Sequence, residues 1–382
     1  MTATAQDFKT PGQLIEHLLQ ERGWTQRILA QVLGLTDSQI SKLVTDKKGV
    51  DAETAILLGD VFRVEPESFL DLQKNYDLAK ARLTFRRDRK REIRAELLSG
   101  LPVREMITRG WLDVEDPGDL DAVETKLARF FGVDFPEQIE VLPHVAKKTE
   151  VSAEATPEQI AWLYRVKQVA SQILVTGPFS EIGVRAALKK LDFLLAAPEE
   201  ARQVPRILSD HGIRFVVVES LKVAKIDGVC FWLDERSPVI GMTLRHDRMD
   251  NFWFVLRHEL EHVIRGHGKR AIALDAELEG ESAGTDQSVP EQERIANAAA
   301  ANFCVPQDKL QMFIERKAPI FADRDVRALA RMLNIHPSLI VGQLQWRTQR
   351  YNLLRKHLVR VRSYVLPGSF VDGWGDVFPI NA

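Results

Sequence analysis

The segment Asn251–Gly268 reads Asn-Phe-Trp-Phe-Val-Leu-Arg-His-Glu-Leu-Glu-His-Val-Ile-Arg-Gly-His-Gly. Several of its apolar residues recur at helical spacing and share one face, namely Phe252, Val255, Leu256 and Val263. His258 and His262 are four residues apart, so their imidazoles project from the same side of that helix, one turn apart. The segment therefore predicts a buried helix that presents two imidazoles together.

The spacing His-Glu-x-x-His predicts a metal site. Imidazole nitrogens one helical turn apart can both reach a single ion at roughly 2.0–2.1 Å. Zn²⁺ is the metal that this motif binds, and the Glu beside the first His is the general base toward water. We therefore expect His258 and His262 as ligands of Zn²⁺ and Glu259 as a catalytic residue. The alternative is a chance match in an ordinary helix, and the apolar surroundings and the strands expected before the helix favour the metal site.

Length and composition narrow the class of protein. The chain has 382 residues, is 45% hydrophobic and 28% charged, and carries a net charge of −2. These values predict two or three soluble globular domains. The chain has no overall positive charge of the kind that would indicate a nucleic-acid-binding protein. Two cysteines, Cys230 and Cys304, exclude a disulfide framework and a four-Cys zinc site. No leader pattern and no long apolar run is present, so we expect a cytoplasmic protein that does not associate with a membrane.

The first 82 residues have the pattern of a compact all-helical unit. Helices are expected over residues 11–22, 26–33, 37–44 and 52–62, with another beginning near residue 66. Thr25, Thr36 and Asp51 each precede one of these helices and are typical N-cap residues. Gly34 follows the second helix, where a glycine commonly ends one.

The second and third of these helices have the spacing of a helix-turn-helix. A small residue, a turn glycine and two core positions fall where the motif needs them, at Ala30, Gly34, Ile40 and Leu43. This arrangement leaves a set of polar residues free to contact DNA: Gln26, Thr36, Ser38, Gln39, Lys42, Lys47 and Lys48. Residues 1–80 contain nine Lys and Arg against twelve Asp and Glu. This acidic balance keeps open the alternative of a protein-interaction module with the same fold.

Two segments carry a family resemblance. Gly-Leu-Thr-Asp-Ser-Gln-Ile-Ser-Lys-Leu at residues 34–43 and Glu-Ser-Phe-Leu-Asp-Leu-Gln-Lys-Asn-Tyr-Asp-Leu at residues 67–78 resemble Xre-type repressors and, more closely, HigA-type antitoxins. The resemblance implies a five-helix domain over residues 1–82 that binds palindromic operator DNA as a homodimer. It also implies a cognate toxin as a partner.

Residues 83–205 are helical by pattern and contain no catalytic cluster, so we expect a connector, dimerisation or partner-binding region. Strands are expected next, at residues 213–219, 228–233 and 238–245. The last of these, Pro238–Arg245, is the candidate to pair with an extended substrate backbone. A further strand is expected at residues 359–365, before a turn-rich tail over residues 367–382 that could pack on the site or on a partner.

A second resemblance covers the metal motif. About thirty residues after it, Glu293-Arg-Ile-Ala-Asn-Ala-Ala-Ala opens a helix that closes on Pro306. Together the two motifs look like the ImmA/IrrE family of metallopeptidases. The resemblance implies a zincin-like, gluzincin-type α+β domain over residues 206–366, with Glu293 as the third ligand of Zn²⁺ and Glu291 as the second choice. His267 is expected to be a helix-end residue or to support the ligands from behind.

The whole chain is thus expected to be a multidomain, mainly α protein with one α+β domain. Two functions follow from this organisation. In the first, a DNA-binding regulator of the antitoxin type carries a zinc-dependent endopeptidase that cleaves a regulatory protein, a toxin or itself. In the second, an antitoxin and autorepressor keeps the peptidase fold as a non-catalytic, zinc-stabilised scaffold or sensor.

Overall fold

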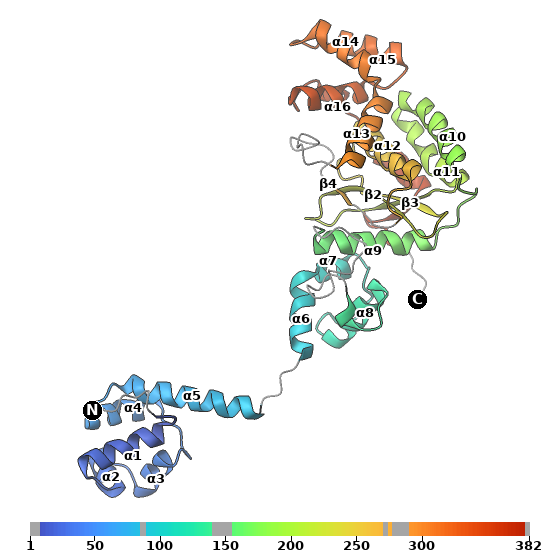
Figure 1. Ribbon diagram of the computed structural model, residues 1–382. Coiled ribbons are helices and arrows are strands. Elements are labelled where there is room, and N and C mark those ends of the chain that lie inside the picture. Colours follow the sequence, from blue (N-terminus) through green and yellow to red (C-terminus); the bar gives the residue numbers. More distant parts are fainter. Residues whose placement is uncertain (1–7, 85–88, 140–154, 270–273, 277–289, 379–382) are drawn as a thin grey trace. The chain divides into compact units, whose positions relative to one another are not determined.

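The computed structural model describes residues 8–84, 89–139, 155–269, 274–276 and 290–378. The chain divides into two compact units, Met1–Arg89 and Lys90–Ala382 (Figure 1). The expected connector over residues 83–205 and the expected peptidase-like domain over residues 206–366 thus fall almost entirely within the second unit.

The first unit is helical throughout its regular structure. Its helices are α1 (Pro11–Arg22), α2 (Gln26–Leu33), α3 (Asp37–Val44), α4 (Ala52–Phe62) and α5 (Pro66–Thr84). The expected bounds of the first four are confirmed, and their caps explain the agreement. The side chains of Thr25 and Asp51 accept hydrogen bonds from the amides of Ile28 and Thr54. Gly34 ends α2 at φ 67°, a conformation that glycine adopts without strain.

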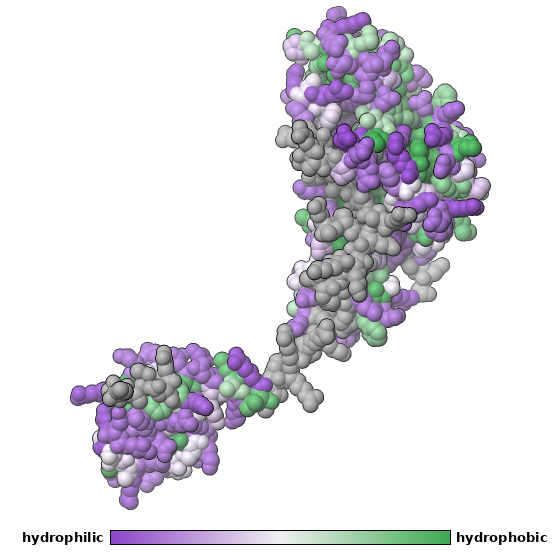
Figure 2. Space-filling view, in the orientation of Figure 1, coloured by the Kyte–Doolittle hydropathy of each residue, from purple (hydrophilic) through white to green (hydrophobic). Residues whose placement is uncertain are grey.

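A small core fixes α2 against α3. Ala30, Ile40 and Leu43 are buried within the core of the first unit, together with Ile15 of α1 and Phe69 of α5. The small side chain of Ala30 lets α2 and α3 approach closely, as the sequence predicts. The surface of this unit that is visible in Figure 2 is mainly hydrophilic.

The second unit begins with helices that the sequence assigns to a connector. They are α6 (Arg89–Gly100), α7 (Val103–Thr108), α8 (Leu120–Phe131), α9 (Pro157–Ser171), α10 (Glu181–Asp192) and α11 (Val204–Asp210). Short 3-10 turns accompany them: η2 (Pro136–Gln138), η4 (Phe193–Ala196) and η5 (Pro198–Gln203). Trp162 and Val166 of α9 share a core with Val216 and Val229 of the sheet. The connector region therefore forms part of the hydrophobic core of the second unit.

The sheet of the second unit has the strand order β4-β2-β3-β1-β5. The strands are β1 (Arg214–Val218), β2 (Ile226–Trp232), β3 (Pro238–Met242), β4 (Leu274–Ala276) and β5 (Phe370–Asp372). β3 pairs antiparallel with β2 and parallel with β1. Both edges of β3 are therefore occupied, and the prediction that Pro238–Arg245 pairs with a substrate backbone is wrong.

Helices cover both faces of this sheet (Figure 1). α9 lies along one face, and α12 (Met249–Arg265) and α13 (Glu291–Cys304) lie on the other. Beyond them are α14 (Gln307–Lys317), α15 (Asp323–Leu333) and α16 (Pro337–Thr348). α16 packs against α12, and a Cβ at Gly342 would lie only 2.1 Å from Asp250 Oδ2. α12 is therefore enclosed between the sheet and other helices.

The expected strand at residues 359–365 is wrong. The structure has η6 (Arg355–His357), α17 (Arg362–Val365) and η7 (Leu366–Gly368) in this part of the chain. Asp247 Oδ1 accepts hydrogen bonds from the amides of Val361 and Arg362, at 3.1 and 2.8 Å. These bonds satisfy two amides at the start of α17, which are then not available for a β-ladder.

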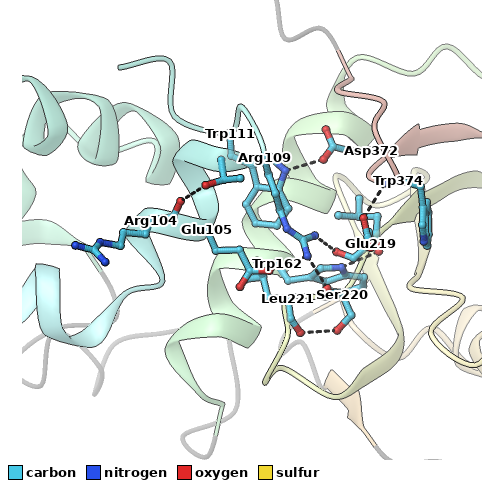
Figure 3. A network of polar contacts seen from close by, with 12 residues as sticks. Arg104, Glu105, Arg109, Trp111, Trp162, Glu219, Ser220, Leu221, Asp372 and Trp374 are labelled. Carbon is cyan, nitrogen blue, oxygen red and sulfur yellow. Dashed lines mark hydrogen bonds and ion pairs between the residues drawn. The ribbon is translucent and has the colours of Figure 1, made fainter. Parts of the chain in front are cut away.

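The tail pairs with the sheet and is joined to α9 by a buried ion pair. β5 pairs parallel with β1, and Arg165 of α9 donates to the Asp372 carboxylate from two guanidinium nitrogens. Trp111 Nε1 donates to Asp372 Oδ1 at 2.6 Å, and Arg109 donates to the carbonyl of Glu219 (Figure 3). The tail, α9 and the segment after α7 are thus joined in one polar network.

Candidate metal centre

α12 brings the two histidines of the motif together. His258 and His262 are 0% and 5% exposed, and their Nε2 atoms lie 3.0 Å apart. The helix ends at Gly266 in the left-handed conformation, φ 69°, immediately after the last turn that carries His262. The buried apolar residues of α12 fix the helix against the sheet, so both imidazoles have a rigid base.

α13 supplies a carboxylate to the same place. Glu293, in the first turn of this helix, places Oε2 3.2 Å from His258 Nε2 and 3.5 Å from His262 Nε2. Among the described residues, these three form the group of side chains that could hold a metal ion. Glu291, the second choice, is exposed and does not belong to that group.

The geometry fits a tetrahedral ion. Two ligand atoms that each lie about 2.0–2.1 Å from one tetrahedral ion are about 3.3 Å apart. The three separations between the ligand atoms are 3.0, 3.2 and 3.5 Å. Oε1 of Glu293 is buried and has no hydrogen-bond partner within the part of the chain that the structure describes. Two imidazoles and one carboxylate are also a donor set of catalytic zinc sites that keep a fourth position open.

The ionisation state of the Glu293 carboxyl group is the one that a metal ligand requires. Burial by itself raises the pKa of this carboxyl group, but hydrogen bonds to His258 and His262 outweigh burial and hold its pKa well below the usual range. Glu293 is therefore ionised at neutral pH, as a metal ligand must be.

Glu259 lies between α12 and the sheet. Its side chain is 0% exposed, and it follows His258 directly in the chain. A Cβ at Gly228 of β2 would lie 2.3 Å from Glu259 Oε1, so the glycine leaves the space that the carboxylate occupies. This role of Gly228 was not predicted from the sequence. A glycine inside an otherwise apolar strand is the signal that could have revealed it, because such a residue commonly marks a close approach.

The second ring nitrogen of each histidine, Nδ1, also has a polar neighbour. Nδ1 of His258 lies 2.9 Å from Asn297 Oδ1, and Nδ1 of His262 lies 2.9 Å from Nδ1 of His267. The sequence predicts that His267 is either a helix-end residue or a support for the ligands. The structure places it in both positions, just past the end of α12 and in contact with His262.

The proposed DNA contacts are mostly on the surface of the first unit. Thr36, Ser38, Lys42, Lys47 and Lys48 are exposed, whereas Gln26 and Gln39 are half-buried. Oε1 of Gln39 accepts a hydrogen bond from the Thr36 amide at 2.9 Å, and the Gln39 amide donates to Thr36 Oγ1 at 3.3 Å. The carbonyl oxygen of the Gln39 side chain is therefore engaged in a capping box at the start of α3.

The fold and the site together define a two-unit protein, with a helix-turn-helix in one unit and a His-His-Glu centre in the other. Residues 15–69 match the helix-turn-helix family HTH_3, and residues 208–335 match Peptidase_M78, the IrrE N-terminal-like domain. The chain therefore belongs to the helix-turn-helix family through its first unit and carries an IrrE N-terminal-like domain in its second.

Three known proteins are similar to about a fifth of the chain. The chain is 33% identical over 72 residues to virulence-associated protein I of Dichelobacter nodosus, covering 19% of this chain and 67% of the relative. It is 34% identical over 74 residues to the uncharacterized HTH-type transcriptional regulator YddM of Escherichia coli K12, covering 19% of this chain and 79% of that protein. A crystal structure from Nostoc punctiforme, assigned as an antidote protein of a plasmid maintenance system, is 26% identical and covers 19% of this chain and 81% of its own, with a TM-score of 0.19.

No helix within the described ranges combines the length and the apolar character that crossing a bilayer requires.

Proposed function

We propose that this protein is a DNA-binding transcriptional regulator whose second unit is a zinc-dependent endopeptidase of the gluzincin type, acting on a regulatory protein partner. One observation carries the proposal: three ligand atoms from α12 and α13 converge within 4.8 Å of one another, and Glu259, the residue after His258, has a fully buried carboxylate. An ordinary packed helix does not need this arrangement, because each of these polar groups costs free energy to bury.

His258, His262 and Glu293 would hold Zn²⁺, which supplies a Lewis acid that polarises a scissile carbonyl and acidifies water. Glu259 would accept a proton from the attacking water and then deliver it to the leaving amine. Glu259 projects toward Gly228 of the sheet, whereas Asn297 contacts His258 from the side of α13.

In this proposal the first unit directs the protein to operator DNA. Ser38 and Lys42 of α3, together with Thr36, Lys47 and Lys48 beside it, form an exposed polar face. In helix-turn-helix proteins the second helix of the motif enters the major groove, and dimers bind two half-sites one helical turn apart. We therefore expect a homodimer on a palindromic operator.

The second candidate function is an antitoxin and autorepressor whose second unit is a non-catalytic scaffold. It is favoured by the segment Glu67–Leu78, which resembles HigA-type antitoxins and forms part of α5. In that case a cognate toxin would be the partner, and Glu259 would not be needed for the biological effect.

Substitution of the base tests the proposal. Glu259→Gln is expected to keep its zinc and to lose cleavage by about 10²–10⁴-fold, because general-base catalysis contributes that much. Proteins encoded beside the gene would be incubated with the wild type and the variant, and cleavage products measured by mass spectrometry. Glu291→Gln, an exposed carboxylate two residues before Glu293, is the matched control and should cleave normally. Equal cleavage by wild type and Glu259→Gln would exclude the mechanism.

A further inference from the structure

The second imidazole of the metal motif is supported by a third histidine that the motif does not include. Nδ1 of His262 lies 2.9 Å from Nδ1 of His267, and Nε2 of His262 is directed toward His258 and Glu293. One ring nitrogen of His262 thus belongs to the metal centre and the other to His267.

We propose that His267 is a positioning residue of the metal centre, which fixes the tautomer and the ring orientation of His262. This inference rests on the metal centre proposed above. If Nε2 of His262 binds the ion, the proton of its neutral ring is on Nδ1. Nδ1–H then donates to Nδ1 of His267, which acts as the acceptor. The partner of a metal-binding imidazole is usually a carboxylate, a carbonyl or water, and here another imidazole takes that place.

His258 provides an internal comparison. Its Nδ1 lies 2.9 Å from Oδ1 of Asn297, at the same separation as the pair formed by His262 and His267. Oδ1 of an asparagine and Nδ1 of a histidine are both two bonds from Cβ. The two ligands are therefore oriented by equivalent acceptor atoms, one on α13 and one on the segment that follows α12.

Hydrogen bonds and two flanking glycines fix the position of His267. The indole Nε1 of Trp232 donates to the carbonyl of His267 at 2.8 Å, and the His267 amide donates to the carbonyl of His262 at 2.9 Å. Gly266 and Gly268 flank the residue at φ 69° and 80°, in the conformation that favours glycine. A Cβ at Gly268 would lie 2.5 Å from the carbonyl oxygen of Cys230, so only glycine lets this segment approach β2.

These contacts also separate His267 from a ligand role. His267 contacts Nδ1 of His262, whereas the nitrogen of His262 near Glu293 is Nε2. Within the described part of the chain, His267 is not among the side chains that converge as a possible metal site. Substitution of His267 should therefore weaken metal binding without abolishing it.

The test is the zinc affinity of the purified full-length protein, measured by competition with a chelating dye. His267→Ala is expected to bind Zn²⁺ about 10–100-fold more weakly, the usual effect of removing a partner of a ligand. His267→Asn places Oδ1 where the ring nitrogen was and should restore most of the affinity. Gly268→Ala, which shifts the segment but keeps the imidazole, should weaken binding as His267→Ala does.

The visible absorption spectrum of the Co²⁺-substituted protein gives a second readout. His267→Ala is expected to change its ligand-field bands, and His267→Asn to resemble the wild type. A role confined to folding would move neither spectrum nor affinity in variants that retain the wild-type circular dichroism. Unchanged zinc affinity in His267→Ala, beside a loss of binding in His258→Ala, would overturn the positioning role alone. A wild type that binds no zinc would overturn the metal centre and this role with it.

Discussion

The carboxylate of Glu259 occupies the space beside Gly228 where any other residue would carry its Cβ. The distance from that Cβ position to Glu259 Oε1 would be 2.3 Å, and the distance to Val255 Cγ1 would be 2.9 Å. Both contacts are with α12, so a larger residue at position 228 would press on the turn of the helix that precedes and includes the metal motif. β2 and α12 can therefore pack this closely because residue 228 is a glycine.

Gly228→Ala should displace Glu259 while the ligands keep their places. We expect peptide hydrolysis to fall by at least tenfold and the zinc content to stay near that of the wild type, because the three atoms nearest to that Cβ position belong to Glu259 and Val255 and none belongs to a ligand. Activity and zinc content of the same preparation would be measured together. Gly241→Ala is the control, because a Cβ at that position of β3 meets Val166 of α9. A similar loss of hydrolysis in both variants would refute a specific role for Gly228.

Arg165 and Asp372 should be among the most sensitive positions for stability. Their side chains are 2% and 1% exposed, and loss of one partner leaves a buried charge uncompensated. Arg165→Met is expected to lower the free energy of unfolding of the second unit by about 3–5 kcal/mol, measured by urea denaturation. Arg206→Ala, at an exposed pair, should change it by less than about 0.5 kcal/mol. If Arg165→Met and Asp372→Asn were simply additive in the double variant, the coupling would be absent.

Glu261 should stabilise the second unit in a pH-dependent manner. Burial raises the pKa of this group, but hydrogen bonds from Arg257 and Arg265, each 2.7 Å long, outweigh burial and lower its pKa below 4.5. The stabilisation is therefore fully present above about pH 4.5 and is lost as the pH falls through the folded-state pKa.

Glu261→Gln should accordingly lower the free energy of unfolding by roughly 1–2 kcal/mol at pH 7. The difference from the wild type should be the same at pH 6 and should shrink only below pH 4.5. Urea denaturation over this pH range provides the measurement, with Glu235→Gln, at an exposed pair with Lys269, as the control. A difference that grew as the pH fell would contradict the assignment.

Lys42 of α3, together with Lys47 and Lys48 just after this helix, should contribute to DNA binding through phosphate contacts. Replacement of Lys42, Lys47 and Lys48 by Ala is expected to weaken binding to the DNA upstream of the gene. The slope of log affinity against log salt concentration should fall by about 0.9 for each phosphate contact that is lost. Fluorescence anisotropy at several salt concentrations would measure both quantities. Lys74→Ala, on α5 and 61% exposed, should leave the slope unchanged. An unchanged slope in the triple variant would remove these lysines from the interface.

Local signals explain which parts of the fold were predictable from the sequence. Thr25, Thr36 and Asp51 act through bonds to amides three residues away, so their caps fix helix ends without knowledge of the rest of the chain. The spacing of His258 and His262 likewise needs only one helix. The position of Glu293 depends on contact between two helices, and it was accessible only through a family resemblance.

Long-range relationships were not predictable in this way. Asp372 meets Arg165 across 207 residues of sequence, and no local pattern indicates this pairing. The burial of β3 between two other strands depends on β1 and β2 folding around it, since its own apolar pattern fits a central strand as well as an edge. The segment 359–365 has β-branched residues, yet the side chain of Asp247, more than a hundred residues earlier, caps a helix there.

The metal content of the purified protein tests the central claim most directly. Inductively coupled plasma mass spectrometry should find about one zinc per chain in the wild type and in Glu259→Gln. It should find little zinc in His258→Ala, His262→Ala or Glu293→Ala, whereas Glu291→Ala should resemble the wild type. A full zinc complement in Glu293→Ala together with its loss in Glu291→Ala would move the third ligand to the other carboxylate. Wild-type zinc in all three ligand variants would contradict the account that His258, His262 and Glu293 bind one ion.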